Sequence, residues 1–255
     1  MVFEAEDLVN QAIERHGDNI GVACSFGKDS MVVLHMALKV NPNIKVFFAN
    51  TGVEFPETIL FKEKIKEKWN LNLFESKPIK TFWECAKNYG LPSPRGRGKN
   101  RQPKCCIYSK ERPLENLQKE QGIYAIFTGL MAEESRQRKL TMMRYDHKKA
   151  PRMEHEGFFF CGQRWHSVHD NMWKYHPLAY WSEEDIWNYI KKNNIPVNEV
   201  YTKWNGLYKR CGCLPCTAYL DWEKKLPKSH PKLYLMLKNI QDSKQSKLKE
   251  AVLND

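Results

Sequence analysis

Short apolar segments alternate with amphipathic stretches through the first part of the chain. The apolar runs lie at 20–23, 44–49 and 71–74, and helical spacing marks the stretches 31–40 and 56–69 between them. This strand–helix–strand–helix–strand order requires parallel strands joined by right-handed crossovers, with helices on both faces. The sequence therefore predicts an α/β fold with a Rossmann-like parallel sheet.

Further elements flank this pattern. Residues 3–16 and 105–119 are predicted helices, and residues 123–128 are a fourth predicted strand. Ser182 to Asp185 have the spacing of a capping box, which predicts a helix through Lys192. One or two basic helices are expected at the C-terminal end, whereas 139–172 show no regular pattern apart from the apolar run 158–161.

A polar turn, Ser25-Phe26-Gly27-Lys28-Asp29-Ser30, follows the first predicted strand. Backbone N–H groups at a strand-to-helix turn converge on one point, where they favour an anion such as phosphate. Ser25 and Ser30 would contact phosphate oxygens, Lys28 would neutralise charge, and Asp29 would orient the lysine or hold Mg²⁺. The alternative is a capped turn without a ligand. Asn50-Thr51-Gly52 follows the second strand and is expected in the same crevice.

Five of the eight cysteines lie in two groups. Cys105 and Cys106 are adjacent, and Cys213 and Cys216 form a C-x-x-C close to Cys211. Four thiolates from two loops bind zinc or an iron–sulfur cluster. Adjacent cysteines reach one small ion only with strain, so the pattern favours a [4Fe–4S] cluster; buried unligated thiols are the alternative.

The formal net charge of +11 indicates either a partner that carries phosphates or a solubilising basic surface. Arg95 and Arg97 lie in the basic, Pro- and Gly-rich segment 91–104, which is either a lid over phosphates or a solvated loop. A tRNA or DNA substrate fits this charge. No apolar run is long enough to span a membrane, and the acidic N-terminal segment does not resemble a signal peptide. We therefore expect a cytoplasmic protein that does not bind membranes.

The turn at 25–30 resembles the pyrophosphate loop (PP-loop) of the adenine nucleotide alpha-hydrolase superfamily. With the Cys-Cys and Cys-x-x-C pairs, the chain resembles the adenylyl-sulfate and phosphoadenylyl-sulfate reductase family over about 18–220. The matching segments are Asn50-Thr51-Gly52-Val53-Glu54-Phe55-Pro56-Glu57-Thr58, Lys104-Cys105-Cys106 with Lys110 and Pro113-Leu114, Thr128-Gly129-Leu130 with Glu134-Ser135, and His176-Pro177-Leu178 with Trp181-Ser182-Glu183-Glu184-Asp185-Ile186-Trp187.

This resemblance implies a nucleotide-binding domain over 1–175 and a C-terminal helical region over 176–255 that completes a [4Fe–4S] site. It implies an adenine nucleotide, either ATP with Mg²⁺ or adenylyl sulfate, and a sulfur donor or thioredoxin-like reductant; a homodimer is compatible with the sequence. The expected nucleotide-binding residues are Ser25, Phe26, Gly27, Lys28, Asp29, Ser30, Asn50, Thr51, Gly52 and Gly129. The expected substrate-binding residues are Arg95, Arg97, Lys110, Glu134, Arg136 and Arg138.

The sequence also departs from the reductase pattern. Asn50 replaces an aspartate, Met131 stands where reductases carry an arginine, and no cysteine follows Cys216, although reductases use a cysteine near the C-terminus as nucleophile. Cys161 or Cys211 would have to substitute. Lys28-Asp29-Ser30 is the form found in members that cleave ATP.

Three hypotheses follow from these features. The first is an ATP-dependent sulfurtransferase that adenylylates its substrate, with Lys28, Asp29 and Cys211 as catalytic residues. The second is a sulfonucleotide reductase that releases sulfite. The third is a nucleic-acid-binding module without turnover.

Overall fold

The computed structural model describes residues 1–93, 103–134, 164–167, 171–219 and 221–253. The chain divides into two compact units, each assembled from three segments. Unit 1 contains Met1–Phe48, Leu60–Glu75 and Leu114–Asn198, and unit 2 contains Ala49–Ile59, Ser76–Pro113 and Glu199–Asp255. The division into domains at 175 stays a prediction.

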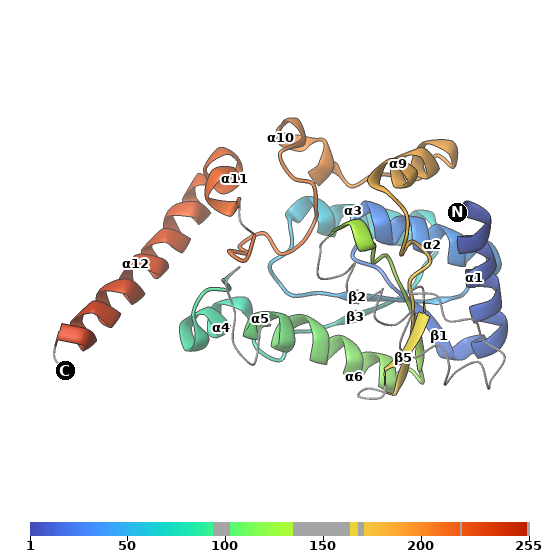
Figure 1. Ribbon diagram of the computed structural model, residues 1–255, viewed down its shortest axis with the longest axis horizontal. Coiled ribbons are helices and arrows are strands. Elements are labelled where there is room, and N and C mark those ends of the chain that lie inside the picture. Colours follow the sequence, from blue (N-terminus) through green and yellow to red (C-terminus); the bar gives the residue numbers. More distant parts are fainter. Residues whose placement is uncertain (94–102, 135–163, 168–170, 220, 254–255) are drawn as a thin grey trace. The chain divides into compact units, whose positions relative to one another are not determined.

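Unit 1 is built on a six-stranded sheet with the order β3-β2-β1-β4-β6-β5 (Figure 1). Its strands are β1 (Ile20–Ala23), β2 (Lys45–Ala49), β3 (Asn72–Ser76), β4 (Ala125–Thr128), β5 (Arg164–Ser167) and β6 (Met172–Tyr175), the last residues of β2 and β3 belonging to unit 2. β1 pairs in parallel with β2 and β4, and β4 pairs in parallel with β6. The expected α/β fold is confirmed, but β5 is an antiparallel edge strand that the sequence did not indicate.

Helices cover both faces of this sheet (Figure 1). On one side, α2 packs against α1 and α9, while Leu114 and Leu117 of α6 pack on the other side against Phe47 and Ile126. The bounds are α1 (Val2–His16), η1 (Gly17–Asn19), α2 (Lys28–Val40), α3 (Pro56–Lys68), α6 (Arg112–Glu120), η3 (Ala132–Glu134) and α9 (Glu183–Lys192). The units share α3 and α6 because their boundaries fall inside these helices.

The predicted capping box is present at the start of α9. The Ser182 hydroxyl accepts a hydrogen bond from the Asp185 N–H, and the Asp185 carboxylate accepts one from the Ser182 N–H. Both interactions satisfy backbone donors that the first helical turn leaves open.

Unit 2 is mainly helical. Its elements are α4 (Phe82–Tyr89), α5 (Lys104–Cys106), the π-helical turn η2 (Ile107–Glu111), η5 (Glu199–Tyr201), α10 (Lys203–Gly206), α11 (Trp222–Ser229) and α12 (Pro231–Leu253). Phe82, Trp222, Leu226 and Leu237 form an apolar core between α4, α11 and α12. The two C-terminal helices were expected, whereas α4 was not.

No helix in the described ranges has both the length and the apolar character that crossing a bilayer requires.

Candidate functional site: a phosphate-binding turn and a cysteine cluster

The PP-loop turn in unit 1 lies between β1 and α2. Helix α2 begins at Lys28, earlier than the predicted Met31, so Lys28, Asp29 and Ser30 form its first turn. The N-cap Gly27 is extended, and no side chain caps the helix. The first turn of a helix points its backbone N–H groups toward its N-terminal end, and the helix dipole favours negative charge there.

Phe26 gives the turn its shape. It has φ 55°, which is unusual for a residue other than glycine, and its side chain is fully buried with the ring 5.5 Å from that of Phe48. The Asn198 side chain donates a hydrogen bond of 3.2 Å to the Phe26 carbonyl. Phe26 is thus an anchor for the backbone. No local pattern in the sequence indicated the role of Asn198, because it lies far along the chain.

The polar side chains of the turn converge. The Ser25 and Ser30 hydroxyls lie 3.3 Å apart, and the Ser30 hydroxyl donates to the Gly27 carbonyl. Lys28 is only 6% exposed, and its Nζ donates a hydrogen bond of 2.7 Å to Asp29 and lies 4.0 Å from Glu183. Asp29 therefore contacts the lysine, one of the two roles expected for it; Mg²⁺ binding stays a prediction.

Gly129 packs directly against the start of α2. A Cβ atom at this position would lie 2.8 Å from Asp29 C and Ser30 N, so only glycine lets the end of β4 approach the turn. Beside it, the Thr128 hydroxyl lies 2.6 Å from His176 Nδ1 on the neighbouring segment after β6. Gly129 therefore shapes the turn by close packing, while direct contact with a nucleotide stays a prediction.

The four expected metal ligands all lie in unit 2. Cys105 and Cys106 are in α5, and Cys213 and Cys216 are on the loop before α11; all four are partly buried. The π-helical turn Ile107–Glu111 follows the cysteine pair directly. Such turns often mark functional positions in helices.

Asn50, Thr51 and Gly52 also belong to unit 2, where they support the C-x-x-C loop. The Thr51 hydroxyl lies 3.5 Å from Cys213 Sγ and hydrogen-bonds to Glu54, and the Leu214 N–H donates to the Val53 carbonyl. The Asn50 side chain accepts a hydrogen bond from the Gly52 N–H. The sequence did not reveal this supporting role, and the expected nucleotide contacts of this segment stay a prediction.

The adjacent cysteines differ in their acidity. A hydrogen bond from Cys105 and, to a smaller extent, the Lys110 ammonium lower the pKa of Cys106 to about 7, against the effect of burial. The same hydrogen bond, burial and the neighbouring thiols raise the pKa of Cys105. Burial raises the pKa of Cys213, and it raises that of Cys216 to about 11. Of the four thiols, Cys106 is therefore the one whose surroundings favour the thiolate, the form that binds metals.

The donor set fits an iron–sulfur cluster better than a single ion. The four thiols are close enough for their charges to interact. Across the described ranges, however, no three His, Cys, Asp or Glu side chains converge as ligands of one metal ion. A cubane accepts one thiolate at each of four separate irons, so it does not require the sulfurs to meet at one point.

The remaining site predictions have different outcomes. Cys211 is 8% exposed and packs with Phe55 and Val200, which is the environment of a core residue. Lys110 lies in η2 and Glu134 in η3. Outside the described residues lie Arg95, Arg97, Arg136, Arg138 and Cys161. Roles for all of these residues in catalysis or substrate binding stay predictions.

A family model described as the phosphoadenosine phosphosulfate reductase domain matches residues 19–219. The chain belongs to this family. It is 33% identical over 218 residues to an adenosine 5'-phosphosulfate reductase from Oceanobacillus iheyensis, with 85% of this chain and 79% of that protein covered. It is 30% identical over 215 residues to a protein of the same name from Staphylococcus haemolyticus, with 84% and 76% covered. The predicted family is confirmed, and with it an enzyme of the sulfonucleotide reductase family.

Solved structures show the same fold. A phosphoadenylyl-sulfate reductase from Candida auris has a TM-score of 0.58 at 20% identity and covers 82% of this chain and 88% of its own. The U34-tRNA thiolase NcsA from Methanococcus maripaludis, solved with its [4Fe-4S] cluster, has a TM-score of 0.51 at 15% identity, with 94% and 78% covered. The PP-loop fold is therefore shared by proteins named for different reactions.

Proposed function

We propose that this protein is a reductase of adenylyl sulfate, with the nucleotide at the PP-loop turn and a [4Fe–4S] cluster on Cys105, Cys106, Cys213 and Cys216. The observation that carries the proposal is the gathering of all four cysteines in one compact unit of a reductase-family chain. The names of relatives at 30–33% identity support the reductase function, and the cluster of the structurally similar thiolase supports the cofactor.

The reaction would transfer the sulfonyl group from the nucleotide to a thiol. A thiolate attacks the sulfonyl sulfur, the bond between that sulfur and the phosphate oxygen breaks, and AMP leaves as the oxyanion. A second thiol then attacks the thiosulfonate sulfur bonded to carbon, which releases sulfite and leaves a disulfide; the thioredoxin-like reductant supplies the two electrons. Lys28, the Ser25 and Ser30 hydroxyls and the first N–H groups of α2 would stabilise the charge that develops on the leaving phosphate.

Three thiols are candidates for the first attack: Cys161, Cys211 and a thiol of the reductant itself. Ligation of the cluster by four cysteines would leave no iron open to sulfur, so its contribution would be structural and electrostatic. We therefore assign the sulfonyl acceptor to none of the four ligands.

A second candidate, ATP-dependent sulfur transfer, is favoured by one specific observation. Lys28 and Asp29 are paired at the N-terminus of α2 in the Lys-Asp-Ser form that ATP-cleaving relatives carry. In that reaction a substrate oxygen attacks the α-phosphate of ATP and pyrophosphate leaves. The outer sulfur of a persulfide donor then displaces AMP from the substrate, and a second thiol attacks the donor's inner sulfur, which releases the thiolated substrate and leaves a disulfide. Cys211 and Asp29 would be its further catalytic residues, and tRNA or DNA its substrate.

The two reactions differ in their products. Anaerobically purified protein is incubated with adenylyl sulfate, phosphoadenylyl sulfate or ATP, and with reduced thioredoxin. We expect sulfite and AMP from adenylyl sulfate. The rate should fall at least about 100-fold in Lys28→Met, because this variant lacks the buried positive charge that would stabilise the leaving phosphate. Lys39→Met is the matched control, since Lys39 lies on the same helix but is half exposed and paired with Glu6.

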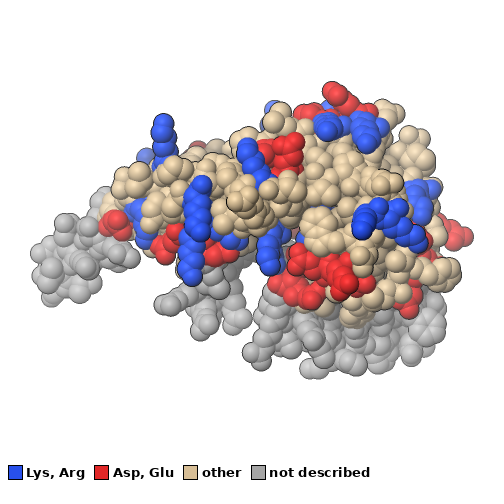
Figure 2. Space-filling model, turned by 90° about the horizontal axis from the view of Figure 1, so that it is seen from above, with Lys and Arg blue, Asp and Glu red and all other residues tan. Residues whose placement is uncertain are grey.

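Pyrophosphate release from ATP that depends on added tRNA or DNA, without sulfite from either sulfonucleotide, would overturn the reductase proposal in favour of sulfur transfer. Absence of turnover together with salt-sensitive binding of nucleic acid would favour the non-catalytic hypothesis. In the face shown in Figure 2, lysine and arginine side chains of the described residues are interspersed with acidic ones, so that face offers no continuous track for a polyanion.

A further inference from the structure

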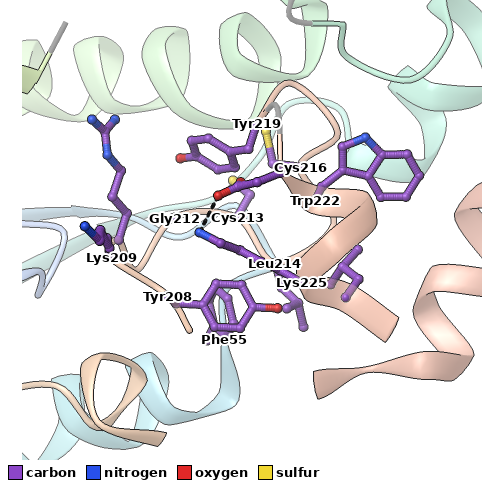
Figure 3. A pocket seen from close by; sticks show the side chains of 13 residues that line it. Phe55, Tyr208, Lys209, Gly212, Cys213, Leu214, Cys216, Tyr219, Trp222 and Lys225 are labelled. Atoms are coloured by element: carbon purple, nitrogen blue, oxygen red, sulfur yellow. Dashed lines mark ion pairs between the residues drawn. The ribbon is translucent and has the colours of Figure 1, made fainter. Parts of the chain in front are cut away.

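Unit 2 contains a pocket of about 230 Å³ beside the C-x-x-C loop (Figure 3). Phe55 and Tyr208 lie along one side of it, Tyr219 lies opposite, and Trp222 and Lys209 lie toward its two ends. Cys213 and Cys216 contribute to its wall, but Cys105 and Cys106 do not. The pocket is therefore not the space among the four expected cluster ligands.

The walls of this pocket are largely aromatic and firmly held. Phe55 is 2% exposed, and its ring lies 4.8 Å from that of Tyr208 in an edge-to-face arrangement. The Tyr208 hydroxyl lies 2.6 Å from the Ser229 hydroxyl of α11, which fixes the ring. Trp222 is buried as well, whereas Tyr219 is 40% exposed. Such rigid, flat surfaces favour a planar ligand, because rings gain stacking energy without ordering flexible side chains.

The charged groups around the pocket are mostly basic. Lys209, Arg210 and Lys225 line it together with one acidic residue, Asp221. Lys225 pairs with Asp221 at 2.6 Å, and Lys209 and Arg210 are the other two basic residues of the lining. An arginine next to a lysine at a rim is suited to a phosphate or carboxylate group.

The backbone that leads to the pocket is strained. Trp204, Asn205 and Gly206 all have positive φ, at 53°, 53° and 70°. The left-handed region is unfavourable for a large residue such as tryptophan. The Trp204 ring lies 5.5 Å from that of Tyr208, so this strained turn packs directly behind the pocket wall. Strain of this kind is concentrated at ligand sites.

We infer that this pocket binds a planar aromatic anion, with the ring between the aromatic walls and the anionic group at Lys209 and Arg210. A nucleoside monophosphate is the ligand class with this chemistry. The inference is independent of the proposed reductase function, because no residue of the PP-loop turn lines the pocket.

The test measures binding of AMP by equilibrium dialysis in protein that carries Lys28→Met, so that the PP-loop turn is weakened. Adenosine and ribose 5-phosphate serve as probes without the anion and without the ring. We expect AMP to bind at one site at least about tenfold more tightly than either probe. Adenosine lacks the contacts of the anionic group, and ribose 5-phosphate lacks the contacts of the ring. The full chain is used throughout.

Variants locate the site. Tyr208→Leu keeps an apolar side chain but removes the flat ring, and Lys209→Gln with Arg210→Gln removes the anion contacts; each should weaken AMP binding about tenfold. The controls are Tyr208→Phe, which keeps the ring, and Lys224→Gln with Lys228→Gln, which removes the same charge from α11 outside the pocket. Controls should retain the affinity of the parent, and all variants should unfold cooperatively.

Three results would overturn the inference. The first is no AMP binding in the Lys28→Met protein, and the second is equal binding by the Tyr208→Leu variant and its phenylalanine control. The third is far tighter binding of a short single-stranded oligonucleotide than of AMP, with a steep dependence on salt. A surface for a nucleic-acid polymer would then explain the site better than a nucleotide pocket does.

Discussion

The PP-loop turn of unit 1 and the cysteine cluster of unit 2 are built on different principles. The turn is a backbone site: its N–H groups, the buried Phe26 and the close approach of Gly129 define it before any ligand binds. The cluster site is a side-chain site whose four thiols come from two segments and do not converge on a single point. The turn is therefore shaped by the fold alone, whereas the proposed cluster would hold the four thiols of the second site together.

The largest effect should come from removing a cluster ligand. We expect Cys213→Ala to lose much of its bound iron and sulfide and of the brown visible absorption, because one iron of the proposed cluster loses its protein thiolate and the cluster is held less tightly. Iron and sulfide analysis after anaerobic purification measures this. Cys85→Ala is the control, since Cys85 is a buried thiol in α4 of the same unit. Zinc in a colourless parent protein would contradict the cluster assignment.

A methyl group at Gly129 should damage the backbone site. Gly129→Ala places Cβ against the backbone of Asp29 and Ser30, so we expect about 1–3 kcal/mol of destabilisation and weaker nucleotide binding with iron content unchanged. Urea unfolding and nucleotide titration measure the two effects. Gly52→Ala is a useful comparison, because φ there is +77° but no atom lies within 4 Å of the new Cβ. Equal nucleotide affinity in the parent and Gly129→Ala would show that the turn tolerates displacement.

The stability of the protein should depend on pH through His16 of unit 1. Burial, together with Arg15, lowers the pKa of His16 to about 4, and its Nε2 lies 2.8 Å from the Tyr175 hydroxyl. Unfolding restores an ordinary pKa, so the unfolded state binds a proton first as the pH falls below about 6.5. We expect the free energy of unfolding to fall by about 2 kcal/mol between pH 7.5 and pH 5.

Urea unfolding across this pH range, for the parent and for His16→Gln, isolates the contribution of the histidine. The variant should be less stable at pH 7.5 but should have a flatter dependence on pH. If the free energy of unfolding depends on pH with the same slope in the variant and the parent, groups other than the buried histidine of unit 1 control the acid sensitivity.

The smallest effect should come from Thr51, which decides to which site the loop at 50–52 contributes. Thr51→Val keeps the backbone hydrogen bond to Glu54 but removes the hydrogen bond from the hydroxyl to Glu54 and its contact with Cys213, at a cost of about 1 kcal/mol. We expect faster loss of iron to a chelator and little change in nucleotide affinity. The opposite pattern, a tenfold weaker nucleotide complex with unchanged iron release, would make the loop part of the nucleotide site.

The two sites were also unequally predictable from the sequence. The strand-to-helix turn at 25–30 follows from local patterns, because apolar periodicity places β1 and α2 and thus fixes what lies between them. The cysteine spacing indicated a cluster, but not the support from Thr51, since a contact between residues so far apart leaves no local pattern. The sheet edge was missed for a related reason. β5 and β6 have mixed polar and aromatic residues, and they become strands because β6 pairs with β4 and β5 pairs with β6 in the folded chain.

The assembly of unit 2 from three separate segments has a consequence for biosynthesis. Cys105 and Cys106 emerge from the ribosome long before Cys213 and Cys216, and the residues of unit 1 from Leu114 to Asn198 are made in between. The sheet of unit 1 can therefore form while half of the cluster ligands are still missing. Insertion of the proposed cluster would then be a late step, and until then the early cysteine pair would be exposed to oxidation or to the wrong metal.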